Sequence, residues 1–168
     1  MSKINEFRSK LNRYVNPVSQ VIAGEELAKN PPYPYVEMFV LNQVIDFHTN
    51  DEQIISRIDN TVKEKTIKFN TAMLQLNCRH KTINEALELA NTLYKIINYV
   101  KREDLINAGI GIKNMSQIRS LHYQEAGKWT YCFSFDVEIC FDTVEEKNID
   151  TIGTIEITIK NEEVTFNE

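Results

Sequence analysis

The stretch from Trp129 to Thr143 alternates between apolar and polar side chains with almost no error. Side chains on a β-strand point to opposite faces with a period of two. The pattern predicts one strand of about 45 Å, which is longer than most strands in globular proteins. Its apolar row is Tyr131, Phe133, Phe135, Val137, Ile139 and Phe141, and its polar row is Cys132, Ser134, Asp136, Glu138, Cys140 and Asp142. A strand this long with an acidic face suggests a structural element as much as an enzyme core.

Acidic residues are concentrated at the end of the chain. Residues 131–168 hold ten acidic side chains against two basic ones, whereas residues 36–130 hold eleven acidic and twelve basic ones. The net charge of −5 therefore comes from the last segment. Proteins that grip DNA need clustered Lys and Arg to neutralise phosphates. This part of the chain is expected to repel phosphate instead.

Length and composition indicate one domain spanning residues 1–168, with a core of its own. The sequence has no apolar run of about 18 residues, so no transmembrane helix is expected. Charges throughout Met1 to Lys10 argue against a signal region, so the chain is expected in the cytoplasm. The odd number of cysteines (Cys78, Cys132 and Cys140) predicts reduced thiols rather than a disulfide framework.

Two stretches carry helix signals. Ser2 is a suitable N-cap for apolar residues that recur at helical spacing up to Val15, and this helix is expected to end before Pro17. Thr82 and Glu85 form a capping box ahead of a second apolar stripe. We expect that helix to run to about Asp104 or Asn107, with the turn at Gly109.

Several further stretches read as strands or turns. Tyr35 to Phe47 and Thr66 to Cys78 predict two strands, joined by the polar stretch His48 to Glu64, which has room for a short helix at Glu52 to Ile58. A shorter strand is expected at Ile110 to Ile118, and Gly127 marks a turn before the long strand. Short C-terminal strands are expected at Thr154 to Ile159 and Val164 to Phe166.

The order of these elements predicts an α+β fold. We expect one mainly antiparallel sheet of about four long strands, with two main helices packed on one face and a short C-terminal β segment. The aromatic face of the long strand is expected to hold the helices.

The sequence predicts no catalytic, cofactor or metal site. Cys78 and His80 would need Cys132 and Cys140 to complete a zinc site, but one extended strand holds those two about 27 Å apart. Asp136 with the Glu145-Glu146-Lys147 run resembles the ligands of a metal-dependent nuclease. Such catalysis needs carboxylates that converge from neighbouring elements, whereas these follow one another along a single strand.

Four local features resemble the neck and tail terminator proteins of tailed bacteriophages. Pro34-Tyr35-Val36 opens the first strand, and Thr66 to Cys78 forms the second. Glu85-Ala86-Leu87-Glu88-Leu89-Ala90 begins the long helix. Phe135-Asp136-Val137-Glu138-Ile139, followed by Ile149-Asp150-Thr151-Ile152, lies in and after the last long strand. In order and spacing, these features span nearly the whole chain.

The resemblance implies a structural virion protein without enzymatic activity. Such proteins form a ring, usually of six subunits, at the head-proximal end of the tail tube. The ring ends tube polymerisation and joins the tail to the head-completion or connector protein, and DNA passes through its lumen. Two alternatives remain: another connector component, such as a head-completion or tail-tube protein, and a metal-dependent nuclease.

Within a ring, an acidic wall would let a DNA duplex slide without lingering. We expect five carboxylates to face the lumen: Asp136, Glu138, Asp142, Glu145 and Glu146. A solvated outer sheet surface explains the same residues equally well. Head-to-tail rings also need two different contact patches per subunit. Candidates are Asp51 and Arg57 in the polar stretch, and Tyr123 and Trp129 near the turn, although core packing accounts equally well for Trp129.

Overall fold

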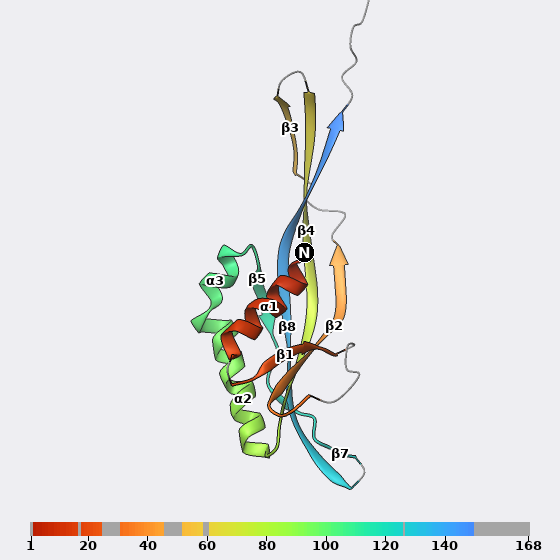
Figure 1. Ribbon diagram of the computed structural model, residues 1–168. Coiled ribbons are helices and arrows are strands. Elements are labelled where there is room, and N and C mark those ends of the chain that lie inside the picture. The colour runs from red at the N-terminus through yellow and green to blue at the C-terminus, as the bar shows by residue number, and fades with distance from the viewer. Residues whose placement is uncertain are drawn as a thin grey trace, which may run out of the picture.

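A computed structural model describes residues 2–16, 18–24, 31–45, 52–58, 61–125 and 127–149 (Figure 1). Its helical elements are α1 (Lys3–Val15), α2 (Ile83–Lys95), the π-helix η2 (Ile96–Val100) and α3 (Arg102–Asn107). Its strands are β1 (Gln20–Ala23), β2 (Tyr35–Ile45), β3 (Glu52–Ile58), β4 (Thr61–His80), β5 (Gly111–Met115), β6 (Arg119–Ser120), β7 (Tyr123–Glu125) and β8 (Lys128–Ile149).

The pairing of β4 with β8 forms the backbone of the fold. The two strands have 20 and 22 residues and run antiparallel from the Val62–Ile149 pair to the His80–Tyr131 pair without a register shift. The predicted long strand is confirmed and extends six residues further at its C-terminal end. Because no register shift occurs, odd-numbered side chains of β8 stay on one face of the sheet and even-numbered side chains on the other over the whole strand.

The predicted fold class is wrong, because the sheet is mixed. Its order is β1-β2-β4-β8-β5, and β1 pairs with β2 in parallel. Seven of the described strands share this sheet, and β7 forms a separate hairpin with β8. The prediction of about four strands missed β1, β3, β6 and β7. β1, β6 and β7 have four residues or fewer, too few to show an alternating pattern, whereas β3 lies in the stretch that was interpreted as a polar connection.

The second helical stretch is also not one helix. The N-cap is as predicted, since Thr82 Oγ1 accepts a hydrogen bond from the Glu85 N–H at 3.3 Å. The helix then widens into η2, where the Lys101 N–H donates to the Ile96 carbonyl, and α3 follows. The described residues therefore hold three α-helices and one short π-helix, where sequence periodicity predicted two helices.

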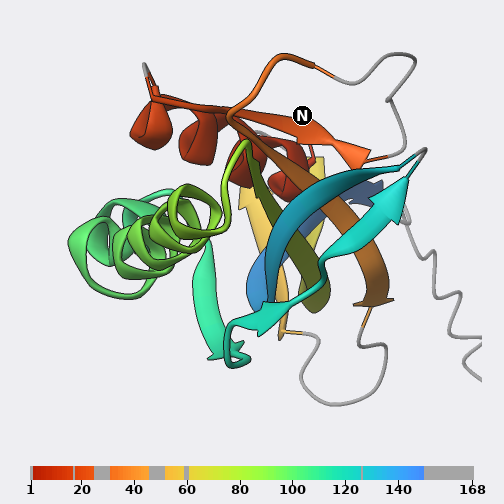
Figure 2. The ribbon, with the colours of Figure 1, turned by 90° about the horizontal axis from the view of Figure 1, so that it is seen from below.

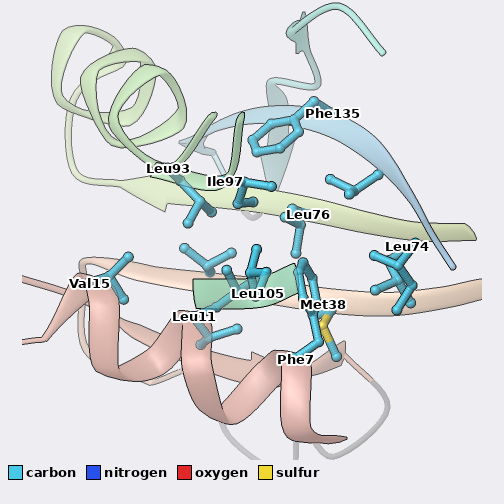
Figure 3. Packing of buried hydrophobic residues seen from close by; sticks show 14 of the residues in the cluster. Phe7, Leu11, Val15, Met38, Leu74, Leu76, Leu93, Ile97, Leu105 and Phe135 are labelled. Carbon is cyan, nitrogen blue, oxygen red and sulfur yellow. The ribbon is translucent and has the colours of Figure 1, made fainter. Parts of the chain in front are cut away.

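The helices cover one face of the sheet. Figure 2 shows α1 and the α2–α3 segment on the same side of a curved sheet, and Figure 3 shows side chains from these elements converging. Phe135, Val137 and Ile139 of β8 are fully buried there, in one core cluster with Phe7 and Leu11 of α1. The apolar row of β8 thus forms the floor of the core. Burial of each such side chain contributes about 1.5–3 kcal/mol.

One end of the molecule projects beyond the helices (Figure 1). The predicted short helix at Glu52 to Ile58 is wrong: this stretch is β3, which pairs with β4 from Glu52–Ile67 to Ile58–Thr61. β3, the first residues of β4 (61–67) and residues 142–149 of β8 together form a three-stranded ribbon, which we call the extension. The expected strands at 154–159 and 164–166 lie outside the described residues.

Candidate functional surfaces

Four of the five predicted channel-facing carboxylates share one face of β8. Asp136, Glu138, Asp142 and Glu146 have even numbers on an uninterrupted strand, so they point away from the helices. Glu145 lies on the other face, where its carboxylate binds Lys68 Nζ at 2.7 Å. The structure therefore brings together four of these residues and separates the fifth.

Basic partners neutralise part of this row. Arg119 donates through both terminal nitrogens to the carboxylate of Asp136, at 2.7 and 2.8 Å. Lys113 Nζ binds Glu138 Oε1 at 2.8 Å. Asp136 and Glu138 are therefore paired with basic side chains, whereas Asp142 and Glu146 lie exposed on the extension, with Lys65 of β4 opposite Glu146.

The start of the polar row is buried instead of exposed. Cys132 and Ser134 lie on the same face as Asp136, yet they are 1% and 0% exposed. At this end β6 and β7 pair with β8, and Arg79 reaches Tyr123 across the face. Burial raises the pKa of the Cys132 thiol to about 11, so the thiol is protonated at neutral pH.

A buried ion pair, which sequence reasoning missed, lies on the same face. Arg79 Nε is 2.8 Å from Glu37 Oε2, and both side chains are almost fully buried. Arg79 also donates to the Tyr123 hydroxyl at 2.9 Å and lies over the Tyr123 ring. Burial is the largest single influence and lowers the pKa of Arg79, but the hydrogen bond and the charge of Glu37, with smaller contributions from Cys132 and Tyr123, together raise it overall.

The predicted interface residues fall at opposite ends of the molecule. Tyr123 and Trp129 belong to the β7–β8 hairpin, and β3, which contains Arg57, lies in the extension (Figure 1). Trp129 is 59% exposed and Tyr123 is 43% exposed. Asp51 lies outside the described residues, as does the side chain of Arg57. The exposure of Trp129 removes the core-packing explanation for this residue.

The carboxylates of the suggested nuclease site do not converge in the structure. The described residues contain no group of three or more His, Cys, Asp or Glu side chains placed to hold a metal ion. Asp136 and Glu145, the suggested nuclease pair, lie on opposite faces of β8 and about 30 Å apart along the strand. Among these residues, no helix has the length and apolar character required to cross a membrane.

Comparison with known proteins gives one family. A family model described as phage neck terminator protein matches residues 5–164, which is nearly the whole chain. A search of curated proteins finds no match. The matched range includes both long strands, the extension and all of the described helices except the first two residues of α1.

Proposed function

The chain belongs to the phage neck terminator family, and from that premise we propose that six copies form a ring at the head-proximal end of a tail tube. The ring ends polymerisation of the tube and joins the tail to the head-completion or connector protein. It assembles in the host cytoplasm and stays in the virion neck. Its role is structural and involves no catalysis.

The observation that carries the ring proposal is the open edges of the extension. Among the described residues, β3 pairs only with β4, and β8 beyond Phe141 also pairs only with β4. Each of these strands therefore has one edge with unpaired backbone groups, and such edges readily accept another strand. The two edges differ in sequence, as a head-to-tail interface requires. The exposed aromatic residues at the other end, Tyr123 and Trp129, suit contact with a second protein.

The acidic face supports passage of DNA through the ring. Asp142 and Glu146 are exposed, and they share a face with Asp136 and Glu138. Six copies carry a net charge of about −30, which disfavours lasting contact with phosphate. We propose that this face lines the channel. Glu145 lies on the opposite face and belongs to the channel wall only if both faces of the extension meet the lumen.

Electron microscopy of phage assembled without this protein tests the proposal. We expect tails of uncontrolled length, or tails of normal length that fail to join heads. Particles of purified protein should appear as rings when it is added to isolated tails, because the tail tip provides a template. Normal tails joined to heads in the absence of the protein would rule out a terminating and joining role.

A further inference from the structure

A polar groove separates β5 from the helical layer. It has a volume of about 250 Å³. One wall consists of Tyr94, Asn98 and Arg102, which follow one another at a spacing of four along α2, η2 and α3. The other wall is residues 112–115 of β5. The groove therefore runs between a helical segment and a strand.

The strand that forms this groove lies at the edge of the sheet. Among the described strands, β5 pairs only with β8, so its outer edge has no neighbouring strand. An edge strand beside a helix is a common template for an added peptide strand, which bonds to the backbone of the edge and places alternate side chains in the groove.

The charge of the groove selects an acidic segment. Arg102 forms no ion pair with any described residue, whereas Lys113 is already bound to Glu138 at 2.8 Å. Tyr94, Asn98 and Asn114 add neutral polar groups to the lining. An extended segment with a carboxylate near Arg102 would gain a charge-assisted hydrogen bond there.

One segment of this chain has the required pattern and lies outside the described residues. Thr154, Glu156 and Thr158 alternate with Ile155, Ile157 and Ile159, as on a strand with one polar row. Glu162 and Glu163 follow shortly after and add negative charge. Glu156, in the middle of the polar row, is a suitable partner for Arg102.

Geometry assigns this segment to a neighbouring copy. Gly111 of β5 pairs with Cys140, and β8 then runs nine residues away from it, about 30 Å, to Ile149. Five further residues span at most about 18 Å, so Thr154 cannot lie beside the β5 of its own chain. A second copy, held next to the first, has no such restriction.

We propose that residues 154–159 of one copy add as a strand to β5 of the next, with Glu156 directed at Arg102. This inference rests on the proposed ring, because the ring supplies the adjacent copy. It adds a second contact between subunits, separate from the open edges of the extension.

Disulfide trapping between two differently tagged full-length chains tests the exchange. One chain carries Asn114→Cys in the groove, and the other carries Thr158→Cys, which lies on the same polar row and leaves Glu156 in place. We expect a mixed disulfide in several-fold higher yield than with the control Gln43→Cys, which is exposed on β2 and separated from β5 by β4 and β8. Introducing Arg102→Glu into the Asn114→Cys chain should lower the yield several-fold, whereas Arg102→Lys should preserve it. Equal yields from these two variants would overturn the pairing.

Two results would overturn the assignment of residues 154–159 to a neighbouring copy and would leave the proposed ring standing. The first is a yield no higher than the control in particles that electron microscopy shows to be rings. The second is an intramolecular disulfide at high dilution in one chain that carries both Asn114→Cys and Thr158→Cys. The absence of rings together with normal tails assembled without the protein would instead reject the proposed function.

Discussion

At the scale of single residues, the ion pair between Arg79 and Glu37 is the most consequential contact on the sheet face opposite the helices. Both side chains are nearly buried, 11% and 4% exposed, and Asn77 also donates to the Glu37 carboxylate at 3.4 Å. The two residues are far apart in the sequence, and their meeting depends on the register of β2 on β4. No local pattern encodes that register, so the sequence could not have revealed the pair.

Removal of one partner should therefore destabilise the protein strongly. We expect Arg79→Met to lower the free energy of unfolding by about 3–5 kcal/mol, because Glu37 is left as an uncompensated buried charge. Urea unfolding followed by circular dichroism measures the change. The control is Arg119→Met, which breaks a more exposed pair with Asp136 and should cost about 1 kcal/mol. Adding Glu37→Met to Arg79→Met should recover part of the lost stability. Equal, small losses in Arg79→Met and Arg119→Met would contradict the argument.

The residue-level predictions from alternation were partly correct. The faces of Phe135, Val137 and Ile139 followed directly from their spacing. Cys132 and Ser134 are buried although they lie on the polar face, because a period of two assigns side chains to faces but says nothing about what covers a face. The covering contact between Arg79 and Tyr123 is again long-range.

At the scale of elements, helix starts were predictable and helix ends were less so. The N-caps at Ser2 and Thr82 are confirmed, because a cap depends on a few adjacent residues. The break of the second stretch at η2 has no Pro or Gly within it. Ile97 of η2 and Leu105 of α3 both pack in the core, and such long-range packing cannot be read from helical spacing.

The cap at Thr82 should be measurable by itself. We expect Thr82→Ala to lower the free energy of unfolding by about 1 kcal/mol, because the Glu85 N–H loses its acceptor. Thr92→Ala is the matched control, since Thr92 is exposed within α2 and Ala favours a helix. Thermal or urea unfolding of both variants provides the comparison. A loss in Thr92→Ala as large as in Thr82→Ala would argue against the cap.

The capping box also predicts a pH dependence. A hydrogen bond from Thr82, and then the proximity of His80, lower the pKa of Glu85 in the folded protein. A carboxyl group with a lowered pKa adds stability above its unfolded value, about 4.3, and loses it as the pH falls through the folded pKa. The difference in stability between the wild type and Glu85→Gln should therefore shrink as the pH falls below about 4. A difference that stays constant from neutral to acidic pH would contradict the assignment.

Sheet topology was the least predictable property of the elements. The parallel pairing of β1 with β2 follows from where the chain after α1 meets the sheet, not from any pattern within Gln20–Ala23. The strand β3 carries polar residues typical of a loop, yet it becomes a strand because β4 extends far enough to pair with it. Both errors arise because strand pairing is decided by distant segments.

At the scale of the whole molecule, both the shape and the charge of the extension suit a subunit of a ring around DNA. The extension carries two open strand edges beyond the helical layer, and the exposed acidic residues Asp142 and Glu146 lie on it. The sequence predicted the acidic row and the length of β8. It did not predict that Arg119 and Lys113 neutralise the row near the helices, because those pairs form only through β5, β6 and the chain between them.

This distribution makes the charge of the channel testable. Wild-type rings should bind duplex DNA weakly at low salt, whereas rings carrying Asp142→Lys and Glu146→Lys should retain it. The double substitution changes the net charge of a six-subunit ring from about −30 to about −6 and places the added lysines on the proposed wall. Binding of the variant should weaken steeply as salt rises, because phosphate contacts release counterions.

The matched control separates position from net charge. Glu88→Lys with Glu103→Lys changes the ring charge by the same amount, but both residues are exposed on the helical layer. If the sheet face lines the channel, DNA threaded through rings should be retained only by the Asp142 and Glu146 variant, as measured by filter binding of circular against linear duplex. A closed circle cannot thread a closed ring, so channel retention requires a free end. Equal retention by both variants, or equal retention of circles and linear duplex, would place Asp142 and Glu146 on the outer wall.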